Sequence, residues 1–117
     1  MDESRKMAIQ VIREYLRDLE HSRTYPWKSA EYMQICYSKI AAIKILEKLK
    51  TDRLRSPMTI IENFRDQMDH YSYMNEFNSR IFSIQFDAST FILDQIIEEK
   101  ERRLIQNGQN KIRKVHT

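Results

Sequence analysis

Glycine and proline are scarce in this chain of 117 residues, which contains one glycine and two prolines. An average globular chain has about 7% glycine and about 5% proline, so roughly eight glycines and six prolines are usual at this length. The single glycine excludes phosphate-binding loops, dinucleotide-binding turns and kinase glycine loops, which need several glycines close together. So few turn residues also exclude an all-β sandwich, which needs a turn signal about every 8–12 residues.

Cysteine and long apolar runs are scarce as well. Cys36 is the single cysteine, so the chain has no internal disulfide, and this favours a reducing compartment. The longest uninterrupted apolar run has four residues, Ile40 to Ile43, whereas a membrane-spanning helix needs about 18 or more. The start, Met1 to Ser4, lacks the basic-then-apolar order of a signal peptide. We therefore expect a cytoplasmic protein that does not enter a membrane.

Apolar residues are spaced as in a helix over almost the whole chain. This pattern predicts an all-α fold, and the short connectors favour a compact four-helix arrangement of antiparallel neighbours. Ser56 and Pro57 mark the clearest helix start, because serine is a good N-cap and proline suits the first helical position. The predicted helices are one that ends before His21, one from about Pro26–Ser29 to Lys50, one that starts at Pro57, and a long one from about Ser79 to Gln106.

The second predicted helix has an apolar stripe that we expect to face the core. The stripe consists of Met33, Cys36, Tyr37, Ile40, Ile43 and Leu46. A free cysteine in such a stripe behaves as a small buried hydrophobe, and a catalytic thiolate would need a basic setting instead.

The long fourth helix contains one stretch that also fits a strand, because Phe82, Ile84 and Phe86 alternate with other residues. We favour a helix, since no other segment alternates and an isolated hairpin is marginally stable. This helix is apolar over most of its circumference, which predicts a central position in the fold. It has more apolar surface than a four-helix monomer easily buries, so we expect a homodimer.

Asn107 and Gly108 predict the end of this helix, because glycine readily adopts the left-handed conformation that follows a helix. We therefore expect a single helical domain over residues 1–107 and a short, flexible basic tail over residues 108–117.

No catalytic pattern is present in the sequence. Asp66 and His70 are four residues apart, which places two metal ligands on one helical face. A di-iron bundle, however, needs Glu-x-x-His motifs that this chain lacks. We expect no catalytic residues, no metal and no cofactor, and therefore no enzyme.

Charge is distributed unevenly along the chain. Residues 24–57 have seven Lys or Arg against three Asp or Glu, residues 58–100 have three against eight, and residues 101–117 have five against one. The basic segments predict, as an alternative function, a regulator that contacts nucleic-acid phosphates. The candidate residues for that contact are Lys44, Lys48, Arg53, Arg55, Lys111, Arg113 and Lys114.

Large apolar side chains also gather where a connector is expected, over residues 72–78. They either cap the core or form the centre of an interface with a partner protein, because interfaces are rich in such residues. The acidic residues of the preceding helix favour a partner with a basic surface, such as a nucleic-acid-binding effector. The candidate partner-binding residues are Tyr71, Tyr73, Met74, Phe77, Glu62, Asp66 and Asp69. If the helices alternate up and down, Tyr25, Trp27, Tyr73 and Phe77 form one aromatic cluster.

Residues 57–97 resemble small helical proteins of bacterial phages and mobile elements. The resemblance rests on the segment Pro57 to Phe64, on Met68 and Tyr71, on Met74-Asn75 and Phe82-Ser83, and on residues 88–97. It implies no catalytic residues. It implies a context in which such proteins bind and inhibit a host protein, as anti-CRISPR proteins do. The expected function is therefore that of a small non-enzymatic protein-binding module, an inhibitor or accessory factor.

Overall fold

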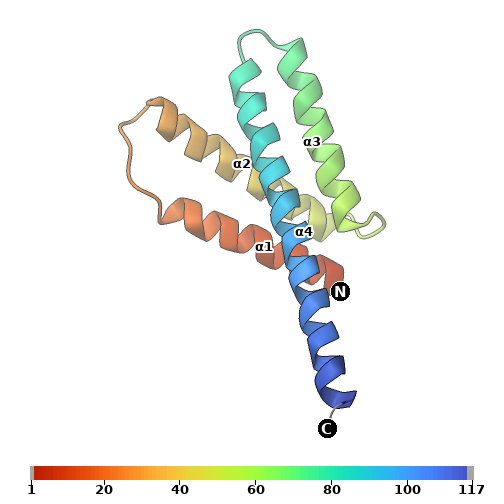
Figure 1. Cartoon of the computed structure of the whole chain (residues 1–117). Helices are drawn as coiled ribbons and strands as arrows, with labels where there is room; N and C mark the ends of the chain where they lie inside the picture. Colours follow the sequence, from red (N-terminus) through yellow and green to blue (C-terminus); the bar gives the residue numbers. More distant parts are fainter. Residues whose placement is uncertain (1, 116–117) are drawn as a thin grey trace.

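The computed structural model describes residues 2–115, with their side chains as far as Gly108. It contains four helices, which Figure 1 shows as two helical hairpins that cross. The helices are α1 (Glu3–Glu20), α2 (Ala30–Thr51), α3 (Pro57–Met74) and α4 (Ser79–Val115). The described residues include no strand. The all-α prediction is confirmed, and the alternating stretch around Ile84 lies inside α4.

Side-chain caps explain where three of the helices begin. The carboxylate of Asp2 accepts a hydrogen bond from the Arg5 amide at 2.7 Å, and the hydroxyls of Ser29 and Ser56 accept equivalent bonds at 3.1 and 3.2 Å. Such a cap satisfies one of the amides that a helix start leaves without a partner. The predicted start at Ser56 and Pro57 is confirmed.

The turn before α2 is made without glycine. Lys28 adopts a φ of 65°, in the left-handed region that glycine usually occupies. Its ammonium group lies 4.5 Å from the centre of the Trp27 ring, a cation–π distance. A lysine in a strained backbone conformation therefore takes the position in this turn that glycine usually occupies.

α4 contacts each of the other three helices, as its predicted central position requires. The core is formed mainly by isoleucine and leucine from all four helices. Its fully buried members include Ile12, Ile45, Leu49, Ile61, Ile92 and Ile96.

The helix stop predicted at Gly108 is wrong. The backbone of α4 stays helical to Val115, and Gly108 does not adopt a positive φ. Figure 1 shows this end of α4 projecting beyond the other helices, and the molecule is 62 × 34 × 21 Å in extent. The division of the chain into a domain and a tail at this glycine stays a prediction.

The face that α2 buries is not the predicted one. Ser38, Ala41 and Ala42 are buried together with Ile45 and Leu49. Ile40 and Ile43, from the predicted stripe, are 37% and 47% exposed, and Cys36 is only partly buried. The physical reason is that small side chains let neighbouring helices approach closely. Ile40 and Ile43 are left partly exposed on another side of α2, which we call its second apolar face.

A buried arginine fixes the start of α1 against the end of α2. Arg5 is 4% exposed, and its Nη1 donates a hydrogen bond to the Leu49 carbonyl at 2.5 Å. Its Nη2 donates another to the Arg55 carbonyl at 2.7 Å, in the connector that precedes α3. Because the C-terminal carbonyls of a helix carry partial negative charge, this position suits a cation.

Candidate interaction surfaces

The end of α3 and the connector that follows it expose large apolar side chains. Tyr73, Met74 and Phe77 are 82%, 70% and 100% exposed. Tyr71 is partly covered, because its ring lies 5.3 Å from that of Phe82. Tyr73, Met74 and Phe77 therefore do not cap the core. We refer to these three residues as the apolar tip; it lies at the turn between α3 and α4 in Figure 1.

α3 extends one turn further than predicted, to Met74, so the connector is only residues 75–78. As a result Tyr73 belongs to the helix and shares a face with three predicted partner-binding residues. Glu62, Asp66, Asp69 and Tyr73 follow one another at intervals of four, three and four residues. This spacing places them along one side of the helix. We call Glu62, Asp66 and Asp69 the acidic stripe of α3.

The acidic stripe lies away from the core, which α3 contacts through residues such as Ile61, Phe64 and Met68. One of its carboxylates is partly neutralised, because Arg65 donates hydrogen bonds to Asp66 Oδ1 at 3.1 and 3.2 Å. Within the described residues, neither Glu62 nor Asp69 forms an ion pair. Two carboxylates of the stripe therefore keep their charge available to a partner.

The predicted cluster of Tyr25, Trp27, Tyr73 and Phe77 does not form. Figure 1 places the α1–α2 connector and the α3–α4 connector at different corners of the molecule, because the two hairpins cross. Trp27 and Phe77 are both largely exposed. The pairing that the structure shows near the tip is that of Tyr71 with Phe82.

The residues predicted to contact nucleic acid do not all line one groove. Lys48 and Arg55 line a notch between α2 and α3, Arg53 lines a separate groove beside α1, and Lys44 lines neither. The side chains of Lys111, Arg113 and Lys114 lie outside the described residues. Lys48 and Arg55 therefore line a different depression of the surface from Arg53.

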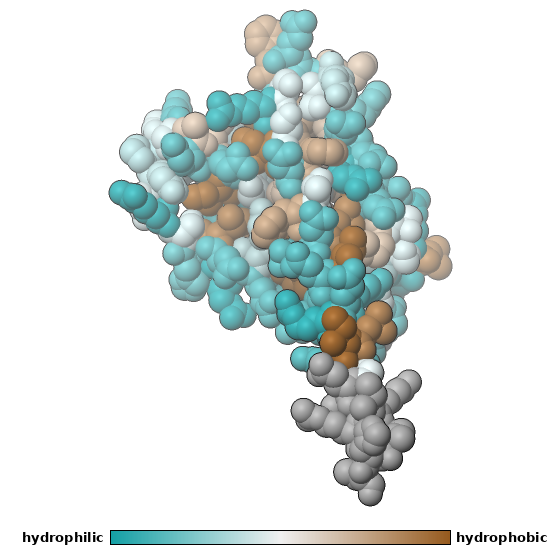
Figure 2. Space-filling model, viewed as in Figure 1, coloured by the Kyte–Doolittle hydropathy of each residue, from teal (hydrophilic) through white to brown (hydrophobic). Residues whose placement is uncertain are grey.

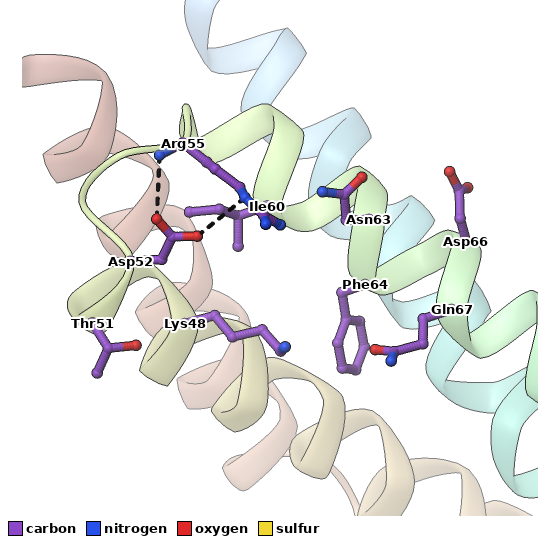
Figure 3. A pocket seen from close by; sticks show the side chains of 9 residues that line it. All are labelled: Lys48, Thr51, Asp52, Arg55, Ile60, Asn63, Phe64, Asp66 and Gln67. Atoms are coloured by element: carbon purple, nitrogen blue, oxygen red, sulfur yellow. Dashed lines mark hydrogen bonds and ion pairs between the residues drawn. The ribbon is translucent and has the colours of Figure 1, made fainter.

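The notch between α2 and α3 has a volume of about 610 Å³ and carries mixed charge. Figure 3 shows Arg55 and Asp52 turned toward each other, with Arg55 Nε 3.6 Å from Asp52 Oδ2. The notch is lined by Lys48, Thr51, Asp52, Arg55, Ile60, Asn63, Phe64, Asp66 and Gln67. Its two cations face two carboxylates, so the notch offers little net attraction to an anion.

The structure adds no catalytic constellation to this picture. In the part of the chain that is described, no three side chains of His, Cys, Asp or Glu gather in a way that could hold a metal ion. Asp66 and His70, the pair considered as metal ligands, both lie on the exposed side of α3. Burial raises the pKa of Tyr15, and a hydrogen bond with Ser38 partly offsets this rise. The centre of the Tyr15 ring lies 5.4 Å from that of Phe91, so this tyrosine has a packing role.

No family model, curated protein or solved structure matches this chain. Among the residues that the structure describes, no helix combines the length and the apolar character that a bilayer crossing requires.

Proposed function

We propose that this chain is a non-enzymatic protein-binding module that docks through the apolar tip. The observation that carries the proposal is the exposure of Tyr73, Met74 and Phe77 where α3 ends and its connector to α4 begins. Tyrosine, phenylalanine and methionine are enriched at the centres of protein interfaces, where a few such side chains supply most of the binding energy. Large exposed apolar side chains lower solubility, and groups of them commonly mark sites where a partner binds. The exposure of the apolar tip therefore supports a docking role.

The acidic stripe supports a partner with a basic surface. It leads along α3 to Tyr73, so a cationic groove on a partner would meet the carboxylates and the tip together. Complementary charge speeds association and selects among partners. Nucleic-acid-binding effectors carry such grooves, and the resemblance of residues 57–97 to phage and mobile-element proteins favours an inhibitor that occupies one in the host.

The test is capture of bacterial host proteins by the immobilised wild type and by the variant Y73A/F77A. Proteins that the wild type retains and the variant loses are then purified, and their affinity for each form is measured by calorimetry. Truncating a side chain at the centre of an interface typically lowers the binding free energy by about 2 kcal/mol or more, so we expect at least about a 30-fold loss of affinity.

Trp27→Ala is the matched control, because Trp27 is also a largely exposed aromatic residue but lies on the connector between α1 and α2. We expect W27A to bind like the wild type. Circular dichroism should show equal helix content for all three proteins, since none of these side chains is buried. Equal capture by the wild type and Y73A/F77A would contradict the proposal.

A further inference from the structure

A groove beside α1 is lined by five cations and one carboxylate, and it has a volume of about 680 Å³. α1 contributes Lys6, Arg13 and Arg17, α2 contributes Lys50, and the α2–α3 connector contributes Arg53. The carboxylate is that of Glu14, which accepts a hydrogen bond from the Gln10 amide at 3.3 Å. We call this feature the basic groove.

The three cations of α1 lie along one face of the helix. Lys6, Arg13 and Arg17 are separated by seven and four residues, and both intervals return to the same side. At about 1.5 Å per residue, the row is roughly 16 Å long. A single small anion could not contact cations spread over this length, whereas a chain of phosphates could.

Most of this charge is not neutralised by the protein. Among the described residues, no ion pair involves Arg13, Arg17, Lys50 or Arg53. Lys6 approaches the exposed Glu3 carboxylate at 3.7 Å, a weak surface contact. Exposed cations without partners keep a positive potential over the groove.

Arg5 shapes the groove without lining it. Its two hydrogen bonds to the Leu49 and Arg55 carbonyls hold the start of α1 against the end of α2. This contact brings Lys50 and Arg53 to the same groove as the α1 row.

We infer that the basic groove binds the phosphate backbone of a nucleic-acid duplex. Arginine, which supplies three of the five cations, matches the geometry of phosphate oxygens with its planar fork. No aromatic side chain lines the groove, so it has no platform on which unpaired bases would stack. Its one apolar lining residue, Ile9, is buried, so the groove lacks the apolar centre of a protein-docking surface.

Binding through phosphates alone has a defined salt dependence. Each neutralised phosphate of a duplex contributes about −0.9 to the slope of log K against log salt, so use of all five cations gives a slope of about −4.5. Such contacts carry no sequence information. We therefore expect binding that is independent of base sequence and that weakens steeply as salt is added.

The experiment is a fluorescence-anisotropy titration of the full chain with duplex DNA, duplex RNA and single-stranded DNA, each about 24 nucleotides long, from roughly 50 to 200 mM salt. The variant R13Q/R17Q removes two exposed cations of the row. We expect it to weaken duplex binding at least about tenfold at low salt and to reduce the magnitude of the slope by about 2. The DNA and RNA arms tell which duplex the groove prefers.

The control R80Q/K100Q loses the same net charge from exposed positions of α4 outside the groove. We expect it to bind within about twofold of the wild type, because uniform charge effects are small beside phosphate contacts. Y73A/F77A should bind duplex like the wild type, which separates this inference from the proposed function.

Four outcomes would overturn the inference. They are a wild type that fails to bind duplex at low salt, an R13Q/R17Q variant that binds normally, a control that weakens as much as that variant, and a poly-glutamate peptide that binds as tightly as duplex. The last would show that the occupant is an acidic protein segment.

Discussion

Arg5 Nη1 lies 2.5 Å from the carbonyl oxygen of Leu49, and both residues are buried where the first helix meets the end of the second. The two residues are 44 positions apart in the sequence. The contact therefore joins distant parts of the chain through one charged hydrogen bond, and it determines where the basic groove forms.

Replacing Arg5 by methionine should lower the free energy of unfolding by about 2–3 kcal/mol. Methionine fills similar space but leaves two carbonyls without a donor, and hydrogen bonds to charged groups are worth about 1.5–3 kcal/mol. Urea unfolding measures the effect. Arg13→Met, at an exposed position of the same helix, is the control and should change stability by less than about 0.5 kcal/mol. Equal stability of R5M and the wild type would show that the contact contributes nothing.

Replacing Lys28 by glycine should raise the free energy of unfolding by about 0.5–1 kcal/mol. Glycine adopts the observed φ of 65° without the steric cost that a β-carbon imposes, although it also gains freedom in the unfolded chain. Lys28→Ala keeps the β-carbon and loses the contact with Trp27, so it should be no more stable than the wild type. Thermal unfolding of both variants checks this, and a K28G variant less stable than K28A would contradict it.

Replacing Gly108 by alanine should increase helix content and stability. Gly108 is helical, and an added β-carbon meets no atom within 4 Å. Alanine is favoured over glycine inside a helix by about 1 kcal/mol. If Gly108 instead ended the helix in the left-handed conformation, the same substitution would be destabilising. Circular dichroism with denaturant titration distinguishes these outcomes by the sign of the change.

The unfolding free energy should fall at alkaline pH in part because of Tyr15. Burial raises its folded-state pKa above the ordinary 10.0, so its contribution is complete below that pH and is lost as the pH rises through the raised value. Tyr15→Phe keeps the ring beside Phe91 and removes the titrating group. We expect Y15F to show a shallower decline as the pH rises above 10.0. An unchanged pH profile would exclude a role for Tyr15.

The predicted homodimer is tested by light scattering, which should return twice the chain mass of 14.2 kDa. The second apolar face of α2 is a suitable contact, because Ile40 and Ile43 are exposed there. I40S/I43K should then shift the mass to that of one chain. Leu54→Ser is the control, since Leu54 is exposed on the α2–α3 connector and away from this face. A wild type of single-chain mass would contradict the dimer.

Elements with strong local signals could be predicted from the sequence, and features that depend on tertiary contacts could not. Ser56 and Pro57 determine a helix start by themselves, so that start was predictable. The buried face of α2 was not predictable in this way. The large isoleucines determine the apolar pattern in the sequence, whereas the helix packs through the small residues Ala41 and Ala42.

The same distinction between local signals and tertiary contacts applies to the candidate surfaces. Whether Phe77 caps the core depends on how the connector folds, which no local pattern determines. The basic groove was missed because residues 1–23 have five bases and five acids, a balanced sum. α1 places Lys6, Arg13 and Arg17 on one side. The contact of Arg5 with the end of α2 brings Lys50 and Arg53 to the same groove. A helical projection of charge, in addition to a segment sum, would have shown the row on α1.

Phe77 contributes no buried surface to the chain, since its side chain is completely exposed. Substitutions at such positions usually change stability by less than about 0.5 kcal/mol. Natural variants can therefore alter this residue without loss of the folded state. Selection for a new partner would then act on a few codons at one turn, while the four-helix scaffold is inherited unchanged.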